Sequence, residues 1–135
     1  MGGPDSEAGA ATTGQRPVPP PGGSVVAVVK DLFFVARIRE TARLVGVPVV
    51  FARSPEELAQ AGGSAPRFAL VDLTADLDYA RIFAVAKQAQ IPVLAFTTHA
   101  LARQTQPWHA RCQRVVTKET LSQELGSLLQ QGFGA

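Results

Sequence analysis

Short apolar runs rich in β-branched residues alternate with longer segments of helical period along most of the chain. The runs are VVAVV at 25–29, VPVVFA at 47–52, FALVDL at 68–73, IPVLAF at 91–96 and RVVT at 114–117. Their hydrophobicity is continuous rather than alternating, which is typical of strands covered on both faces, as in a parallel sheet wrapped by helices. The pattern therefore predicts five buried strands.

The segments between these runs have the signatures of helices. In residues 31–45, apolar side chains recur at i, i+4, i+8 and i+11 from Phe34 onward, and Gly46 closes the segment. Ser54 is followed by Pro55 and then by Glu57, the arrangement of a capping box, which predicts the start of a second helix.

Three further helices complete the alternation. Residues 79–89 carry one apolar face, and residues 119–131 carry leucines at 121, 125, 128 and 129 ahead of Gly132. The helix after Thr98 is expected to be kinked or split, because Pro107 lacks a backbone donor and clashes with the preceding turn. Five successive βα units predict an α/β fold with an open, doubly wound parallel sheet, whose ligands bind beyond the carboxyl ends of the strands.

Composition narrows the class of protein. Residues 1–23 are rich in Gly, Pro and Ala and predict a flexible tail, so the α/β domain is expected over residues 24–135. The apolar runs are too short to cross a bilayer and the N-terminus lacks a secretory pattern, so we expect a cytoplasmic protein with no membrane contact. The net charge is only +2 and no basic run is interleaved with aromatics, which argues against nucleic-acid binding. One cysteine and two histidines are too few for a structural zinc site.

Polar residues stand at or just after the ends of four of the predicted strands. They are Lys30, Asp31, Asp72, Thr97, Thr98 and Lys118. Because the carboxyl ends of parallel strands share one edge of a sheet, these side chains are expected to converge there.

In the order and spacing of these residues, the chain from about residue 24 to residue 131 resembles the receiver domain of two-component response regulators. Receivers carry an acidic pair after the first strand, a phosphoacceptor Asp ending the third, a Thr or Ser ending the fourth and a Lys ending the fifth. The matching positions are Lys30 with Asp31, then Asp72, Thr97 and Lys118. The resemblance implies a flavodoxin-like sheet of strand order 2-1-3-4-5 and a signalling module that acts through protein partners rather than as an enzyme.

The resemblance also implies a role for each position. Asp72 would be the phosphoacceptor, Thr97 and Lys118 would bind the phosphoryl group, and Asp31 with Asp72 would hold Mg²⁺ to offset the developing negative charge. The implied partners are a histidine kinase or a phosphotransfer protein. No output domain follows residue 135, so we expect a single-domain regulator or adaptor, and homodimerisation stays open.

Three departures from the receiver pattern modify this expectation. Lys30 replaces one acidic residue of the pair, so we expect Mg²⁺ to bind weakly or not at all. Lys30 could instead pair with Asp72, which would make the chain a pseudo-receiver that ignores phosphorylation. Strict strand alignment places Thr117 rather than Lys118 at the lysine position, and residues 114–117 supply no aromatic switch.

The candidate residues also have purely structural interpretations. Asp72 could cap the turn that follows it, Asp31 could begin a helix, and Thr97 or Thr98 could cap the fourth helix. Trp108 would be an interface anchor if exposed and a filler if buried. A nucleotide- or flavin-binding protein of the same fold is disfavoured, because the first βα turn, VVKDLFFVAR, lacks the Gly, Ser or Thr cluster that cradles a phosphate.

Overall fold

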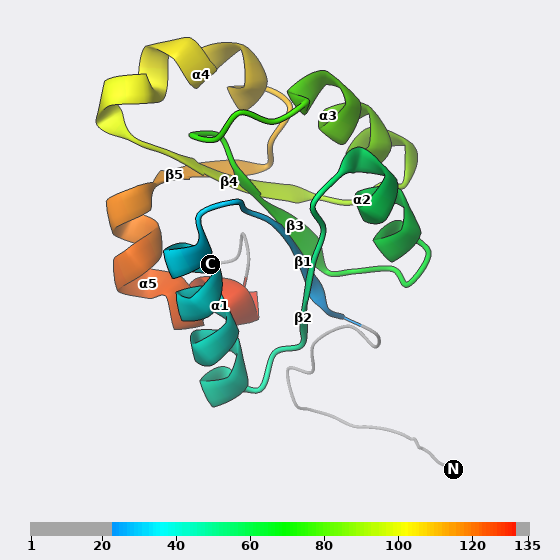
Figure 1. Ribbon diagram of the computed structural model, residues 1–135, viewed down its shortest axis with the longest axis vertical. Helices are drawn as coiled ribbons and strands as arrows, with labels where there is room; N and C mark the ends of the chain where they lie inside the picture. Colours follow the sequence, from blue (N-terminus) through cyan, green and yellow to red (C-terminus); the bar gives the residue numbers. More distant parts are fainter. Residues whose placement is uncertain (1–22, 132–135) are drawn as a thin grey trace.

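A parallel sheet lies between two layers of helices in the computed structural model, which describes residues 23–131 (Figure 1). The strands are β1 (Val25–Val28), β2 (Val49–Phe51), β3 (Phe68–Asp72), β4 (Val93–Thr97) and β5 (Arg114–Thr117). The helices are α1 (Leu32–Val45), α2 (Pro55–Gly62), α3 (Tyr79–Gln88), the 3₁₀ turn η1 (His99–Leu101), α4 (Ala102–His109) and α5 (Lys118–Gln131). The tail expected over residues 1–23, apart from Gly23, and the predicted stop at Gly132 lie outside the described residues.

The strand order is β2-β1-β3-β4-β5, and all four strand pairs are parallel. Both the fold class and the strand order expected from the sequence are therefore confirmed. The central strands β3 and β4 are buried at every position, as their continuous apolar runs predict. Asp72 ends β3 and Thr97 ends β4, so the two residues lie at the same edge of the sheet.

Each face of the sheet has its own apolar core. On one face, α1 and α5 contribute residues such as Phe34, Ile38 and Leu121, which pack with alternate residues of the strands. On the other face, α2 and α3 contribute Leu58 and Phe83 among others. Figure 1 shows the two layers, with α1 and α5 on one side and α2 and α3 on the other. The period-2 alternation of strand side chains supplies both cores at once.

Helix boundaries follow the capping residues in the sequence. The Ser54 hydroxyl accepts a hydrogen bond from the Glu57 N–H at 3.1 Å, while the Glu57 carboxylate accepts from the Arg53 N–H at 2.8 Å. Gly46 ends α1 with φ of 73°, a left-handed conformation in which a side chain would be strained.

The fourth helix differs from the expected kink or split at Pro107. The break falls earlier, where η1 gives way to α4 at Ala102, and Pro107 lies inside α4 only two residues before its end. A proline so close to the end of a helix leaves little helix beyond it to disrupt. Within residues 23–131, no helix combines the length and apolar content needed to cross a bilayer.

Candidate functional site

Asp72 has a nearly buried carboxylate, with 2% of its surface exposed. Its Oδ1 accepts hydrogen bonds from the Thr74 backbone N–H at 2.7 Å and from the Thr74 hydroxyl at 2.5 Å. Among residues 23–131, no hydrogen bond to its Oδ2 is present. Asp72 thus stabilises the turn after β3 through Oδ1, while Oδ2 has no protein donor among these residues.

Asp31 is the N-cap of α1. Its Oδ1 accepts from the Phe33 N–H at 2.9 Å and the Phe34 N–H at 3.2 Å, and its Oδ2 lies 3.5 Å from Lys118 Nζ. The hydrogen bond from Phe34, joined by that from Phe33 and by the charge of Lys118, holds the pKa of Asp31 below its ordinary value. Asp31 therefore stays ionised at neutral pH and already has three protein partners.

Lys118 approaches Asp31 from the first turn of α5. Its Nζ also lies 5.5 Å from the centroid of the Phe34 ring. Thr117, not Lys118, ends β5 and pairs in register with Thr97, and the Thr117 hydroxyl caps α5 by accepting from the Thr120 N–H at 3.0 Å. The structure brings Lys118 together with Asp31, whereas no hydrogen bond or ion pair joins Lys118 to Asp72 in the described part of the chain.

Lys30 is exposed and its ammonium donates to the backbone oxygen of Asp76 at 3.4 Å. No ion pair between Lys30 and Asp72 occurs within residues 23–131. The ion pair considered from the sequence is therefore not the arrangement in this structure, in which Lys30 contacts the loop after β3 instead.

Thr97 belongs to a chain of polar side chains that runs into α4. It is 4% exposed, and its hydroxyl oxygen accepts from the Thr105 hydroxyl at 3.2 Å. Thr105 Oγ1 also lies 2.8 Å from His109 Nε2. When His109 Nε2 carries the hydrogen and donates to Thr105, Thr105 can donate to Thr97, which leaves the Thr97 hydrogen free for another acceptor. Thr98 caps η1, its hydroxyl accepting from the Leu101 N–H at 3.3 Å.

Thr74 and Thr105, which bond to Asp72 and Thr97, were not singled out from the sequence. They line a cavity of about 250 Å³ between the loop after β3 and α4, together with Tyr79 and Trp108. The i, i+4 spacing of Thr105 and His109 is the one local signal that could have indicated their contact.

Trp108 and Cys112 fill space beside this cavity. The Trp108 side chain is half-buried and stacks on Phe83, with ring centroids 5.5 Å apart and an interplanar angle of 10°. The Cys112 thiol donates to the Trp108 carbonyl at 3.3 Å, and burial raises the pKa of Cys112 to about 11. Trp108 therefore fills space between helices more than it offers a free anchor for a partner. The high pKa of Cys112 leaves its thiol protonated at neutral pH.

The donor set at this edge does not fit a Mg²⁺ site. Mg²⁺ requires oxygen ligands in near-octahedral order, usually with carboxylates among them. Asp31 is committed to its cap and to Lys118, and Lys30 brings a positive charge to the same loop. Within residues 23–131, no group of three or more His, Cys, Asp or Glu side chains is placed to hold a metal ion.

Tyr79 is expected to make the fold less stable at alkaline pH. Its hydroxyl lies 2.8 Å from the Asp72 carbonyl oxygen and 2.6 Å from that of Ala75. Burial, joined by the charge of Asp72, raises the pKa of Tyr79 from 10.0 to about 12. The folded state then keeps a proton that the unfolded state loses, so this contribution to stability is complete below about pH 10 and is lost as pH rises towards 12.

Because the Tyr79 side chain is only partly buried, we expect this loss to reach about 1 kcal/mol. Tyr79 is the only tyrosine, so its ultraviolet absorbance reports its ionisation directly. Urea unfolding across the alkaline range should show the decline, and Tyr79→Phe should remove this component of it. An ordinary tyrosine titration in the folded protein would contradict the prediction.

Thr105→Val is expected to lower the free energy of unfolding by about 1–2 kcal/mol, because the nearly isosteric change removes a buried hydroxyl and its contacts to Thr97 and His109. Thr105→Ser keeps the hydroxyl and is the matched control. Thermal unfolding measures both variants, and the His109 ring resonances should move in the valine variant only. Equal losses in the two variants would mean that the hydroxyl stabilises the fold no more than the methyl group does, which would contradict the prediction.

Comparisons with known proteins bear on the fold. No known family matches the sequence, and neither does any curated protein. Among solved structures, the chemotaxis response regulator CheY4 of Vibrio cholerae matches with a TM-score of 0.61 at 23% identity, over 79% of this chain and 98% of that one. FixJ-N matches with a TM-score of 0.56 at 15% identity, over 78% of this chain and 93% of that one.

A de novo designed Rossmann 2x3 protein matches with the same TM-score of 0.56 at 15% identity, over 79% of this chain and 89% of that one. A shared fold at such low identity does not carry a shared function, since a designed protein matches as well as FixJ-N. The fold, strand order and matches to response regulators nevertheless agree with the resemblance in the sequence. This chain therefore has a receiver-like fold.

Proposed function

We propose that this receiver-like domain is a signalling module that binds a protein partner and does so without phosphorylation of Asp72. One observation carries the proposal: the two carboxylates at the carboxyl edge of the sheet already have protein partners. Asp31 holds the start of α1 and faces Lys118, while Asp72 holds the turn at Thr74. Recruiting Asp31 to a metal would require its contact with Lys118 or its cap to break, and within residues 23–131 Asp72 keeps only Oδ2 without a protein donor.

An exposed apolar pair beside this edge supports the choice of a protein partner. Leu32 and Phe33 open α1 directly after Asp31, and their exposed fractions are 81% and 84%. Adjacent large apolar side chains left in water are a feature of surfaces that another protein covers. From the receiver resemblance, the partner is a histidine kinase, a phosphotransfer protein or a protein downstream of one, in the cytoplasm.

Phosphorylation on Asp72 is the second candidate, because its Oδ2 has no protein donor in the described chain and the Thr97 hydroxyl stands at the end of the neighbouring strand. In this alternative, the Asp72 oxygen forms a bond to phosphorus as the bond from phosphorus to the donor breaks. The Thr97 hydroxyl would then donate to the transferred group.

A titration with beryllofluoride and Mg²⁺, followed by amide NMR, distinguishes the two candidates. For the wild type we expect no saturable shifts at Asp72, Thr74 or Thr97. Lys30→Asp returns a carboxylate to the position where receivers have one, lies at an exposed site and serves as the positive control. Saturable wild-type shifts that disappear in Asp72→Asn would reject the proposal in favour of phosphorylation.

A further inference from the structure

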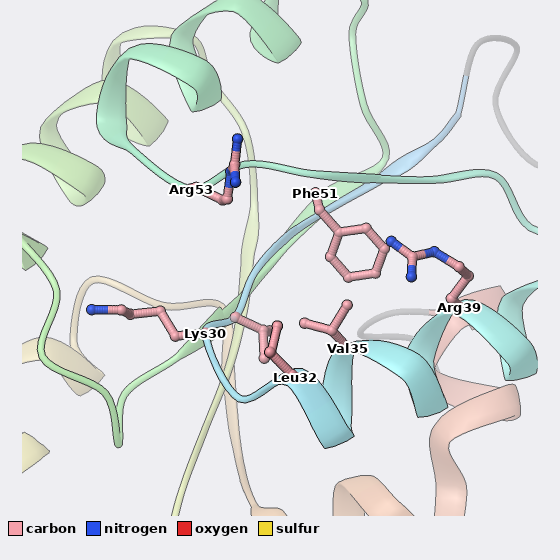
Figure 2. A pocket seen from close by; sticks show the side chains of 7 residues that line it. Lys30, Leu32, Val35, Arg39, Phe51 and Arg53 are labelled. Carbon is pink, nitrogen blue, oxygen red and sulfur yellow. The ribbon is translucent and has the colours of Figure 1, made fainter.

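A second cavity, of about 480 Å³, lies on the β2 side of α1, away from Asp72 and Thr97. Its wall combines apolar side chains of α1, of β2 and of the residue after β1, including Val35, Phe51 and Val29, with the stem of Lys30 and two arginines. Figure 2 shows these side chains around the space between α1 and β2. The volume falls within the range of small-molecule sites, and a mainly apolar wall with few polar groups is typical of them.

The two arginines give the cavity a positive rim. Arg39 lies with its guanidinium carbon 4.9 Å from the centroid of the Phe51 ring, and Arg53 follows β2 in the chain. In Figure 2 the two guanidinium groups flank Phe51, whereas the Lys30 ammonium points away from it. The Lys30 ammonium donates to the Asp76 backbone oxygen, so the positive charge beside the cavity comes from the two guanidinium groups.

Among the residues that the structure describes, none with a carboxylate lines this cavity. Neither Arg39 nor Arg53 forms an ion pair within residues 23–131, whereas Arg43 pairs with Glu40 and Arg81 with Glu56. The carboxylate of Glu57 is bonded to the Arg53 backbone N–H and not to its guanidinium. Two guanidinium groups beside an apolar wall are suited to an anion, because the planar guanidinium donates two parallel hydrogen bonds to phosphate or carboxylate.

We propose that this cavity binds a small organic anion that has an aromatic or similarly flat apolar body and a phosphate or carboxylate group. The body would pack on Phe51, Val35 and the exposed side chain of Leu32. The anionic group would be held between Arg39 and Arg53. Leu32 belongs to this site and to the proposed partner surface, whereas the two arginines that would hold the anion are not part of that surface.

The probe for this proposal is 1-naphthyl phosphate, with 1-naphthol and inorganic phosphate as its separate halves. In amide NMR titrations of the whole chain, 1-naphthyl phosphate should give saturable shifts at the cavity residues. Each half should bind at least about tenfold more weakly, because it makes only one of the two kinds of contact. Equal binding of either half would overturn the proposal, as would the lack of saturable shifts at millimolar 1-naphthyl phosphate.

Matched variants locate the site. Arg39→Gln and Arg53→Gln should each weaken binding by about tenfold, the loss expected for one charge-assisted contact. Arg103→Gln in α4 removes another exposed arginine, outside the cavity, and should leave binding unchanged. Leu32→Ala should weaken 1-naphthyl phosphate and leave inorganic phosphate unaffected. Equal losses in the Arg103 and Arg53 variants would show non-specific charge attraction and reject the site, and thermal unfolding checks that every variant is folded.

Discussion

Phe96→Ala is expected to lower the free energy of unfolding by about 3–5 kcal/mol, the usual cost of deleting a buried aromatic ring. Phe96 lies in β4 with no exposed surface, and its ring centroid is 5.3 Å from that of Phe34. It pairs in register with Asp72 on one side and Val116 on the other. The change therefore empties the core directly beneath the carboxyl edge, where the sheet is too tightly packed to close the gap.

Phe33→Ala is the matched control, because it makes the same chemical change at a side chain that is 84% exposed. Its effect on stability should stay within about 0.5 kcal/mol. Urea unfolding followed by the fluorescence of Trp108, the only tryptophan, measures both variants. Similar losses in the two would mean that Phe96 is not the core residue described above.

Leu121→Ala is expected to lower the free energy of unfolding by about 2–5 kcal/mol. Leu121 has no exposed surface and lies on the face of α5 that packs with α1 and the sheet. It is one turn from Lys118, whose contact with Asp31 depends on the position of α5 against the sheet. A cavity at this point should therefore loosen the start of α5, and the Asp31 and Lys118 resonances should shift in NMR spectra.

Leu44→Ala controls for the leucine change, since Leu44 lies in α1 and is 69% exposed. We expect its loss to stay within about 0.5 kcal/mol and the Lys118 resonances to keep their positions. If Leu121→Ala destabilised the fold without shifting the Lys118 resonances, the contact between Lys118 and Asp31 would not depend on the packing of α5.

The contacts at the carboxyl edge are the basis of the proposal that partner binding does not depend on phosphorylation. A phosphorylation site needs carboxylates that are free to take a cation and a cation that is free to reach the phosphoryl group. Here Lys118 is turned to Asp31, and Lys30 is drawn to the loop at Asp76. Asp72 and Thr97 end their strands as expected, and Asp72 bonds to the turn that follows it, which is the structural alternative considered from the sequence.

Much of the fold was readable from the sequence, because its signals are local. Continuous apolar runs mark buried parallel strands, and capping residues such as Ser54 and Asp31 mark helix starts within three or four positions. Asp31 and Thr98 cap helices and Asp72 bonds to the turn that follows it, which are structural alternatives that the same local rules leave open beside the receiver roles. The predicted break at Pro107 was wrong, because Pro107 lies near the end of α4 and the break falls between η1 and α4.

Sequence pattern by itself determined five βα units and the residues that end the strands. Only the tertiary structure decided which polar side chains come together. Lys118 reaches Asp31 across 87 positions, Thr105 reaches Thr97 from another element, and Arg39 of α1 and Arg53 after β2 line one cavity. The physical reason is range. Periodicity and caps act over a few residues. The partner that a long side chain contacts depends instead on how the helices pack and on which carboxylates already have partners, and neither of these leaves a signal in the local sequence.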